Sequence, residues 1–82
     1  MTRDDVLDKI RAHLADELEL DPAQIEPQTR FREDLSADSL DLYTLVQELD
    51  DTYGVKMTDE QASQILTVDA AIDFVLAHAA DR

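Results

Sequence analysis

Apolar residues recur at the spacing of an amphipathic helix in three separate stretches of this chain. They predict one helix over about residues 3–19, a second over about 39–53, and a last one that Thr67 caps and that continues to about Ala80. The expected buried stripes are Leu7, Ile10, Leu14 and Leu18 in the first helix, Leu42, Leu45, Val46, Leu49 and Tyr53 in the second, and Val68, Ala71, Ile72, Val75, Leu76 and Ala79 in the last.

The two connections between these helices differ in kind. The later one contains a capping box, Thr58–Gln61, which opens a short helix that should end near Gln64 or Ile65. The earlier one, residues 20–38, is a long loop that is plausible in a compact domain only if it is pinned to the helices. Its apolar residues Ile25, Phe31 and Leu35 are placed to do this. The sequence therefore predicts an all-α fold, a small four-helix bundle of three longer helices and one short helix, with a long first loop.

Length and composition indicate a single domain over residues 1–82 with one small core. No apolar run is long enough to span a bilayer. The residues that follow Met1, Thr2–Asp5, lack the apolar stretch of a signal peptide. We therefore expect a cytoplasmic protein.

A net charge of −13 limits the classes of macromolecule that this chain can bind. Nucleic acid is excluded because its phosphate backbone would be repelled, whereas proteins with basic patches would be attracted. Between Glu33 and the terminal Arg82 the only basic residue is Lys56. Self-repulsion of this size predicts a monomer whose stability rises with added salt.

The residues of an active site or a metal site are missing from the sequence. Absence of Cys excludes a disulfide framework, a thiolate metal site and a Cys nucleophile, and the chain has no thiol of its own. His13 and His78 have no partners suggested by spacing, so structural roles are expected for both. A calcium loop with Gly54 at its sixth position would place Leu49 at the first ligand position, which excludes it. We expect no catalytic residues and no metal.

The start of the second helix carries the most informative polar residues. Asp38 can act as the N-cap, which leaves Ser39 at the first helical position. A phosphate on Ser39 would be favoured there, because a helix N-terminus has free N–H donors and partial positive charge. From this stretch alone a simple cap is the favoured interpretation, since caps are far commoner than modification sites.

The polar side of the second helix contains two further rows of residues. One row, which lies opposite the buried stripe, is Asp41, Thr44, Glu48 and Asp51, and the other is Leu40, Tyr43 and Gln47. Single exposed apolar residues carry little meaning. Leu40 and Tyr43, however, lie one turn apart beside Ser39, so a contact surface is as well supported here as a solvated face.

The segment Phe31–Asp41 closely resembles the prosthetic-group attachment region of acyl carrier proteins, in which an Asp-Ser-Leu triplet begins the second helix. The resemblance extends over almost the whole chain, including Tyr53–Val55, Thr58–Glu60 and Thr67–Asp73. It implies that a transferase attaches 4′-phosphopantetheine from coenzyme A to Ser39. It further implies that acyl groups are carried as thioesters on the thiol of that arm, and that the chain is not itself an enzyme.

The resemblance also assigns roles around the attachment point. Asp38 caps the helix and positions the arm, Leu40 is an apolar contact, and Asp41 and Asp51 are acidic contacts for synthases, reductases and acyltransferases, with Asp50 and Glu48 as weaker candidates. Family members of the housekeeping fatty-acid type commonly have Gly where this chain has Ser36. Tyr43, Thr44 and Gln47 on the partner face also differ from the residues common in such carriers. These departures argue for a dedicated lipid or polyketide pathway as the main variant beside general fatty acid synthesis.

Three other functions remain open from the sequence. An aminoacyl or peptidyl carrier would differ only in the enzyme that loads it. An unmodified acidic adaptor would bind basic proteins without any change at Ser39. A hydrolase using Ser39 would need a base that no motif supplies.

Overall fold

The computed structural model describes residues 2–79 and confirms the all-α fold. Within that range there is no strand, only an isolated antiparallel bridge between Arg30 and Thr67. The helices are α1 (Arg3–Leu18), a single 3-10 turn η1 (Pro22–Gln24), α2 (Ser39–Tyr53), α3 (Asp59–Ser63) and α4 (Val68–His78). The same range contains no helix that is both long and apolar enough to cross a membrane.

The observed helix ends differ slightly from the predicted ones. Helix α1 ends one residue early because Glu19 takes a left-handed conformation, with φ of 56°, and caps it. Helix α3 ends at Ser63, just before the predicted end. Helix α4 ends at His78, where Ala79 turns to an extended conformation, and the predicted end at Ala80 lies outside the described residues.

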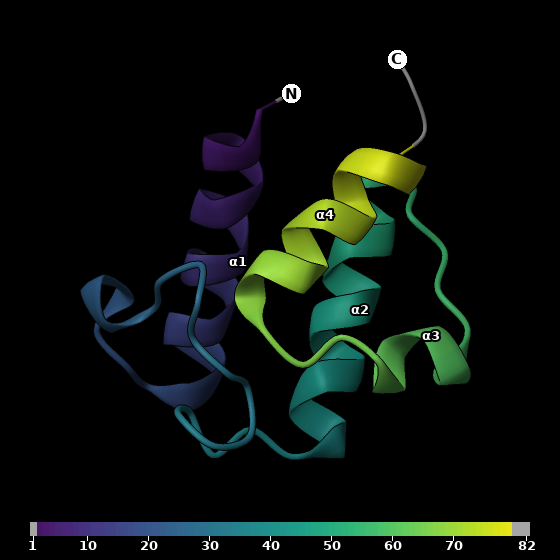
Figure 1. Ribbon diagram of the computed structural model, residues 1–82. Coiled ribbons are helices and arrows are strands. Elements are labelled where there is room, and N and C mark those ends of the chain that lie inside the picture. Colours follow the sequence, from purple (N-terminus) through teal and green to yellow (C-terminus); the bar gives the residue numbers. More distant parts are fainter. Residues whose placement is uncertain (1, 80–82) are drawn as a thin grey trace.

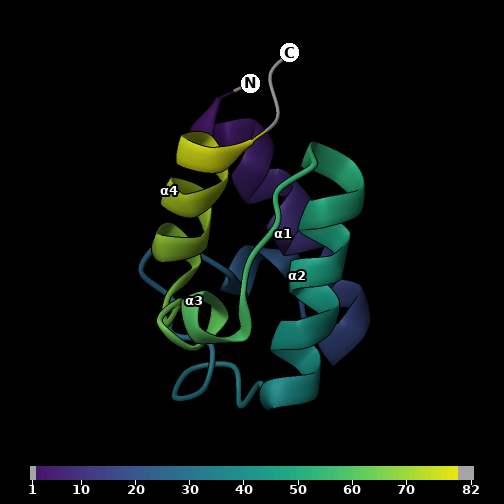
Figure 2. The ribbon, with the colours of Figure 1, turned by 90° about the vertical axis from the view of Figure 1, so that its right-hand side faces the viewer.

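The three long helices form the body of the molecule (Figures 1 and 2). Helices α1 and α2 run in opposite directions, and α1 also packs against α4. The short α3 lies beside the first half of α2, at the end of the molecule where α2 begins. Since α1 begins and α4 ends at the opposite end, the N-terminus of α2 is far from both.

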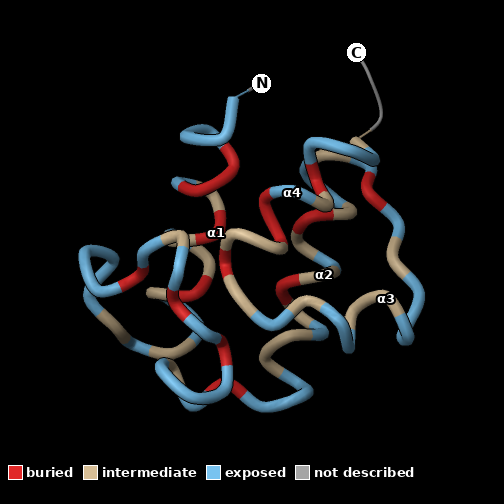
Figure 3. The backbone as a smooth tube through the Cα atoms, viewed as in Figure 1, coloured by how far each residue is buried: buried red, intermediate tan, exposed pale blue. Residues whose placement is uncertain are grey.

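The core is drawn from all three long helices, from the first loop and from the connection between α2 and α3 (Figure 3). Its buried apolar residues are Val6, Leu7, Ile10, Leu14, Ile25, Phe31, Ala37, Leu45, Leu49, Val55, Val68, Ala71, Ile72 and Val75. The loop residues Ile25 and Phe31 are fully buried and Leu35 is partly buried against the core, which confirms that the loop is pinned. The prediction was wrong for Leu76, which is exposed because α4 already buries its Ile72 and Val75 side against the core.

Backbone hydrogen bonds fasten the loop to the start of α4. The Phe31 N–H donates to the Leu66 carbonyl over 3.1 Å, and the Val68 N–H donates to the Thr29 carbonyl over 3.0 Å. The Ala37 N–H then donates to the Phe31 carbonyl over 2.9 Å. The loop therefore has a fixed path up to the residue before the α2 cap.

Candidate functional site

Asp38 and Asp41 form a reciprocal capping box at the start of α2. The Asp38 carboxylate accepts a hydrogen bond from the Asp41 N–H over 3.0 Å, and the Asp41 carboxylate accepts one from the Asp38 N–H over 3.1 Å. Ser39 is the first helical residue and is exposed. The cap is therefore confirmed, and it uses two carboxylates while leaving the Ser39 hydroxyl outside the capping hydrogen bonds.

The residues just before the cap place it against the core. Ala37 is buried, whereas Ser36 is exposed and has a left-handed backbone with φ of 57°. The Ser36 N–H closes a turn by donating to the Arg32 carbonyl over 3.1 Å. The left-handed region favours glycine, so Ser36 holds this turn at some conformational cost.

Arg32 is the charged residue that reaches Ser39. Its Nη2 atom lies 3.3 Å from the Ser39 Oγ and donates a hydrogen bond to it. Arg30, two residues earlier, is turned instead toward Asp34, and hydrogen bonds from Arg30 lower the pKa of the Asp34 carboxyl. Sequence reasoning missed Arg32. Its only signal was a positive charge seven residues before the serine in a strongly acidic chain.

A shallow cavity of about 250 Å³ opens between α2 and α3 beside the hydroxyl. It is lined by Arg32, Ser39, Leu42, Tyr43, Asp59, Ala62 and Ser63. Leu42 and Ala62 provide apolar surface, while the two serines and the charged residues Arg32 and Asp59 make the cavity amphipathic. Because α3 buries none of its own residues, this wall of the cavity is attached less firmly than the helices of the core.

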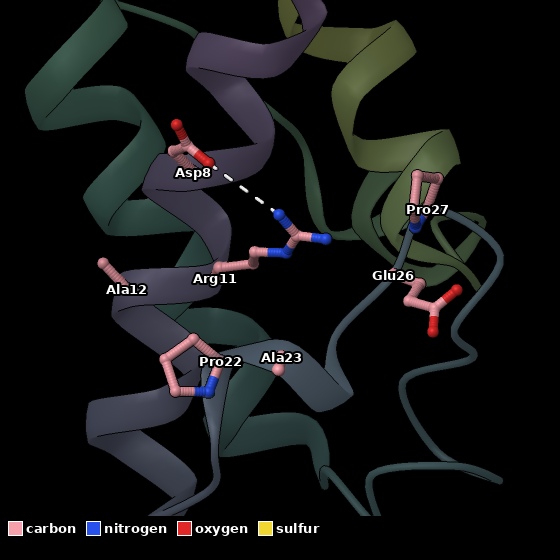
Figure 4. A pocket seen from close by; sticks show the side chains of 7 residues that line it. All are labelled: Asp8, Arg11, Ala12, Pro22, Ala23, Glu26 and Pro27. Carbon is pink, nitrogen blue, oxygen red and sulfur yellow. Dashed lines mark ion pairs between the residues drawn. The ribbon is translucent and has the colours of Figure 1, made fainter.

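A larger hollow of about 650 Å³ lies elsewhere, between α1 and η1, and Ser39 does not line it (Figure 4). Arg11 crosses it, with its Nη1 atom 3.8 Å from an Asp8 carboxylate oxygen, and its Nε donates to the Ile25 carbonyl over 2.6 Å. The hydrogen bond to the Ile25 carbonyl holds the loop to α1, and the ion pair with Asp8 stays within the helix. This hollow is therefore best explained by the packing of the loop against α1.

Four of the residues predicted for the partner face are exposed on α2. Leu40 is 72% exposed and Tyr43 is 54% exposed, and Gln47 and Asp51 are also exposed. Leu40 directly follows Ser39, and Tyr43 also borders the cavity. These four residues therefore form a surface that begins at the serine and continues along the helix.

The structure corrects the predicted position of Thr44 and Glu48, which face α1 and not the side opposite the buried stripe. Glu48 forms an ion pair with Lys9 over 2.8 Å, and the hydrogen bond from Lys9 lowers the pKa of the Glu48 carboxyl. The Thr44 hydroxyl donates to the Asp41 carbonyl over 2.8 Å and lies 3.5 Å from His13 Nε2. Lys9 and His13 of α1 make these contacts from the neighbouring helix, which a helical pattern within α2 alone does not reveal.

Two other predicted contacts already have partners inside the chain. Asp41 belongs to the capping box, and the Asp50 carboxylate lies 3.2 Å from the Lys56 ammonium. His78 has a local contact, because its Nδ1 lies 3.0 Å from the Phe74 carbonyl and its ring stacks on Phe74. Neither histidine lines the cavity beside Ser39. No cluster of His, Cys, Asp or Glu that could hold a metal ion occurs within residues 2–79.

Comparison with known proteins identifies the family. Residues 8–75 match the family described as "Phosphopantetheine attachment site". The chain is 45% identical to an acyl carrier protein of Rubrobacter xylanophilus, with 95% of this chain and 96% of the relative covered. It is 40% identical to one from Thermosynechococcus vestitus, with 92% and 93% covered.

A solved structure of an acyl carrier protein has the same fold as this chain. The acyl carrier protein of Enterococcus faecalis superposes with a TM-score of 0.80 at 34% identity, covering 96% of this chain and all of that one. Sequence and fold agree over nearly the same residues. The chain therefore belongs to the acyl carrier protein family, whose prosthetic group is 4′-phosphopantetheine.

Proposed function

We propose that Ser39 carries the 4′-phosphopantetheine arm and that the chain transports acyl intermediates for other enzymes without catalysing a reaction itself. The observation that carries the proposal is the position of the Ser39 hydroxyl. It is exposed at the first residue of a capped helix, and a guanidinium group lies 3.3 Å from it. A hydroxyl held in this way is open to an approaching enzyme on one side and fixed by the fold on the other.

The residues around Ser39 suit a phosphodiester. The cap satisfies the Asp41 N–H and leaves the first N–H groups of α2 to other acceptors, at the positive end of the helix dipole. The Arg32 guanidinium can pair with a phosphate oxygen. When bound, the arm supplies a thiol on which an acyl group is held as a thioester. The apolar surface of Leu42 and Ala62 beside Ser39 offers that acyl group partial shelter from water.

Attachment needs a separate phosphopantetheinyl transferase that uses coenzyme A. The Ser39 oxygen forms a bond to the phosphorus next to the pantetheine portion, and adenosine 3′,5′-bisphosphate leaves. The serine proton passes to a base of the transferase, since neither histidine of the carrier lines the cavity beside Ser39. The carrier contributes the positioned oxygen and the positive charge beside it.

The partner surface that we propose consists of Leu40, Tyr43, Gln47 and Asp51. These side chains are exposed, whereas Thr44 and Glu48 contact α1. Synthases, reductases and acyltransferases with basic patches would be steered to the acidic helix, and Leu40 and Tyr43 would supply apolar contact. We propose that the chain acts as a monomeric single domain in the cytoplasm, serving fatty acid synthesis or a related lipid or polyketide pathway.

Mass spectrometry tests the proposal directly. The protein is incubated with coenzyme A and a broad-specificity phosphopantetheinyl transferase, and its mass should rise by one arm. Ser39→Ala should show no gain, whereas Ser36→Ala, which removes a neighbouring exposed hydroxyl, should still gain one arm. A gain on Ser39→Ala, or none on the unchanged protein, would overturn the assignment.

A further inference from the structure

All but one of the lysine and arginine residues within residues 2–79 are engaged with carboxylates. Among residues 2–79, five basic side chains lie within 4.0 Å of an acidic partner. The pairs are Arg3 with Asp69 and Asp73, Lys9 with Glu48, Arg11 with Asp8, Arg30 with Asp34, and Lys56 with Asp50. Arg32 is the remaining basic residue in that range, and its guanidinium makes a hydrogen bond to the Ser39 hydroxyl instead.

This exception is informative because carboxylates are abundant around Arg32. Glu33 follows it in sequence, Asp59 lines the same cavity, and the chain has 20 acidic residues in all. Coulombic attraction draws an arginine in such surroundings toward one of them. Its orientation toward an uncharged hydroxyl therefore points to a negative group that arrives later at that oxygen.

We propose that Arg32 is a positioning residue that holds the phosphodiester once the arm is attached, an inference that rests on the proposed modification of Ser39. The phosphorus would be bonded to the same Oγ from which Arg32 Nη2 is now 3.3 Å away, so its free oxygens come within reach of the guanidinium fork. Arg32 thereby offsets the extra negative charge that modification adds to a chain of net charge −13. It also orients the first atoms of the arm toward the cavity between α2 and α3, which Arg32 itself lines.

The test compares the unmodified and modified full-length proteins by NMR, with the mass gain measured on the same samples. The Arg32 Nε–H signal should shift on modification while the Arg30 signal, two residues away, stays in place. The phosphorus signal of the arm should differ between the unchanged protein and Arg32→Gln. In Arg32→Lys the signal should lie between these two, because lysine keeps the positive charge but lacks the guanidinium fork.

Thermal unfolding provides a second readout and a matched control. Modification changes the Tm of each protein. At low salt this change should be about 2–3 °C more negative in Arg32→Gln than in the unchanged protein, and in high salt the two changes should become equal. Arg30→Gln removes the same charge from the same loop and should leave this modification-dependent difference unchanged.

The possible failures are distinguishable. A normal mass gain with an unmoved Arg32 signal and an identical phosphorus signal in Arg32→Gln would overturn the role of Arg32 and leave Ser39 attachment intact. Equal effects of Arg30→Gln and Arg32→Gln would overturn it as well, because any nearby positive charge would then suffice. No mass gain on the unchanged protein would overturn both proposals.

Discussion

Replacing Ser36 with glycine should stabilise the protein and thereby test how the approach to the attachment site is built. Ser36 has φ of 57°, and a residue with a Cβ atom in this left-handed region costs about 1–2 kcal/mol. Glycine removes that cost but loses more backbone entropy on folding, by about 0.5–1 kcal/mol. The net gain should be about 0.5–1 kcal/mol in the free energy of unfolding, which raises Tm by about 2–8 °C in a domain of this size.

The turn itself should survive the substitution. The Ser36 side chain is exposed, and the hydrogen bond that closes the turn uses the backbone N–H, which glycine keeps. Thermal unfolding followed by circular dichroism measures the change. Ser36→Ala is the matched control, because it removes the hydroxyl and keeps Cβ, and it should not raise Tm.

A second site checks that the cause is the backbone. Glu19 has φ of 56° at the end of α1, so Glu19→Gly should give a gain of similar size. The two gains should add, because the residues belong to different turns. A Tm for Ser36→Gly at or below that of Ser36→Ala would refute the reasoning about this turn.

The remaining predictions concern charge. Lys9 lowers the pKa of the Glu48 carboxyl below its ordinary 4.5, so the pair stabilises the fold above that pH and the contribution is lost as pH falls through the lowered pKa. Glu48→Gln and Lys9→Met should therefore both reduce the loss of stability at acid pH in a curve of unfolding free energy against pH. An unchanged curve at acid pH would contradict this. Asp51→Lys should slow the transfer of acyl groups to the carrier by partner enzymes several-fold at low salt, whereas Asp16→Lys on α1 should not. Equal rates for the two variants would mean that α2 is not the surface that partners bind. Tm should rise between low and moderate ionic strength, because screening weakens the self-repulsion of a chain of net charge −13, and a constant Tm would contradict this.

Features that depend on local pattern were predictable from the sequence. The helices follow from their apolar spacing, and the cap at Asp38 follows from residue type and position. The pinning of the loop was also predictable, because Ile25 and Phe31 are apolar in a segment that has no other reason to contain them, and both are fully buried.

Features that depend on contacts between segments were not predictable. A helical wheel places Glu48 on the solvated side of α2, but Lys9 of α1 forms an ion pair with it. No pattern within α2 contains that information. Arg32 could not be assigned because the turn that directs it toward Ser39 depends on the left-handed backbone at Ser36, a conformation more typical of glycine. The pathway also depends on residues outside this chain, because the partner enzymes' own residues decide which carrier surface they match.

The most direct test of the central claim is the mass of the intact protein after incubation with coenzyme A and a phosphopantetheinyl transferase. Our account predicts a gain of one arm, mapped by peptide fragmentation to Ser39 and absent from Ser39→Ala. An unchanged mass, or an arm mapped to any other residue, would contradict it.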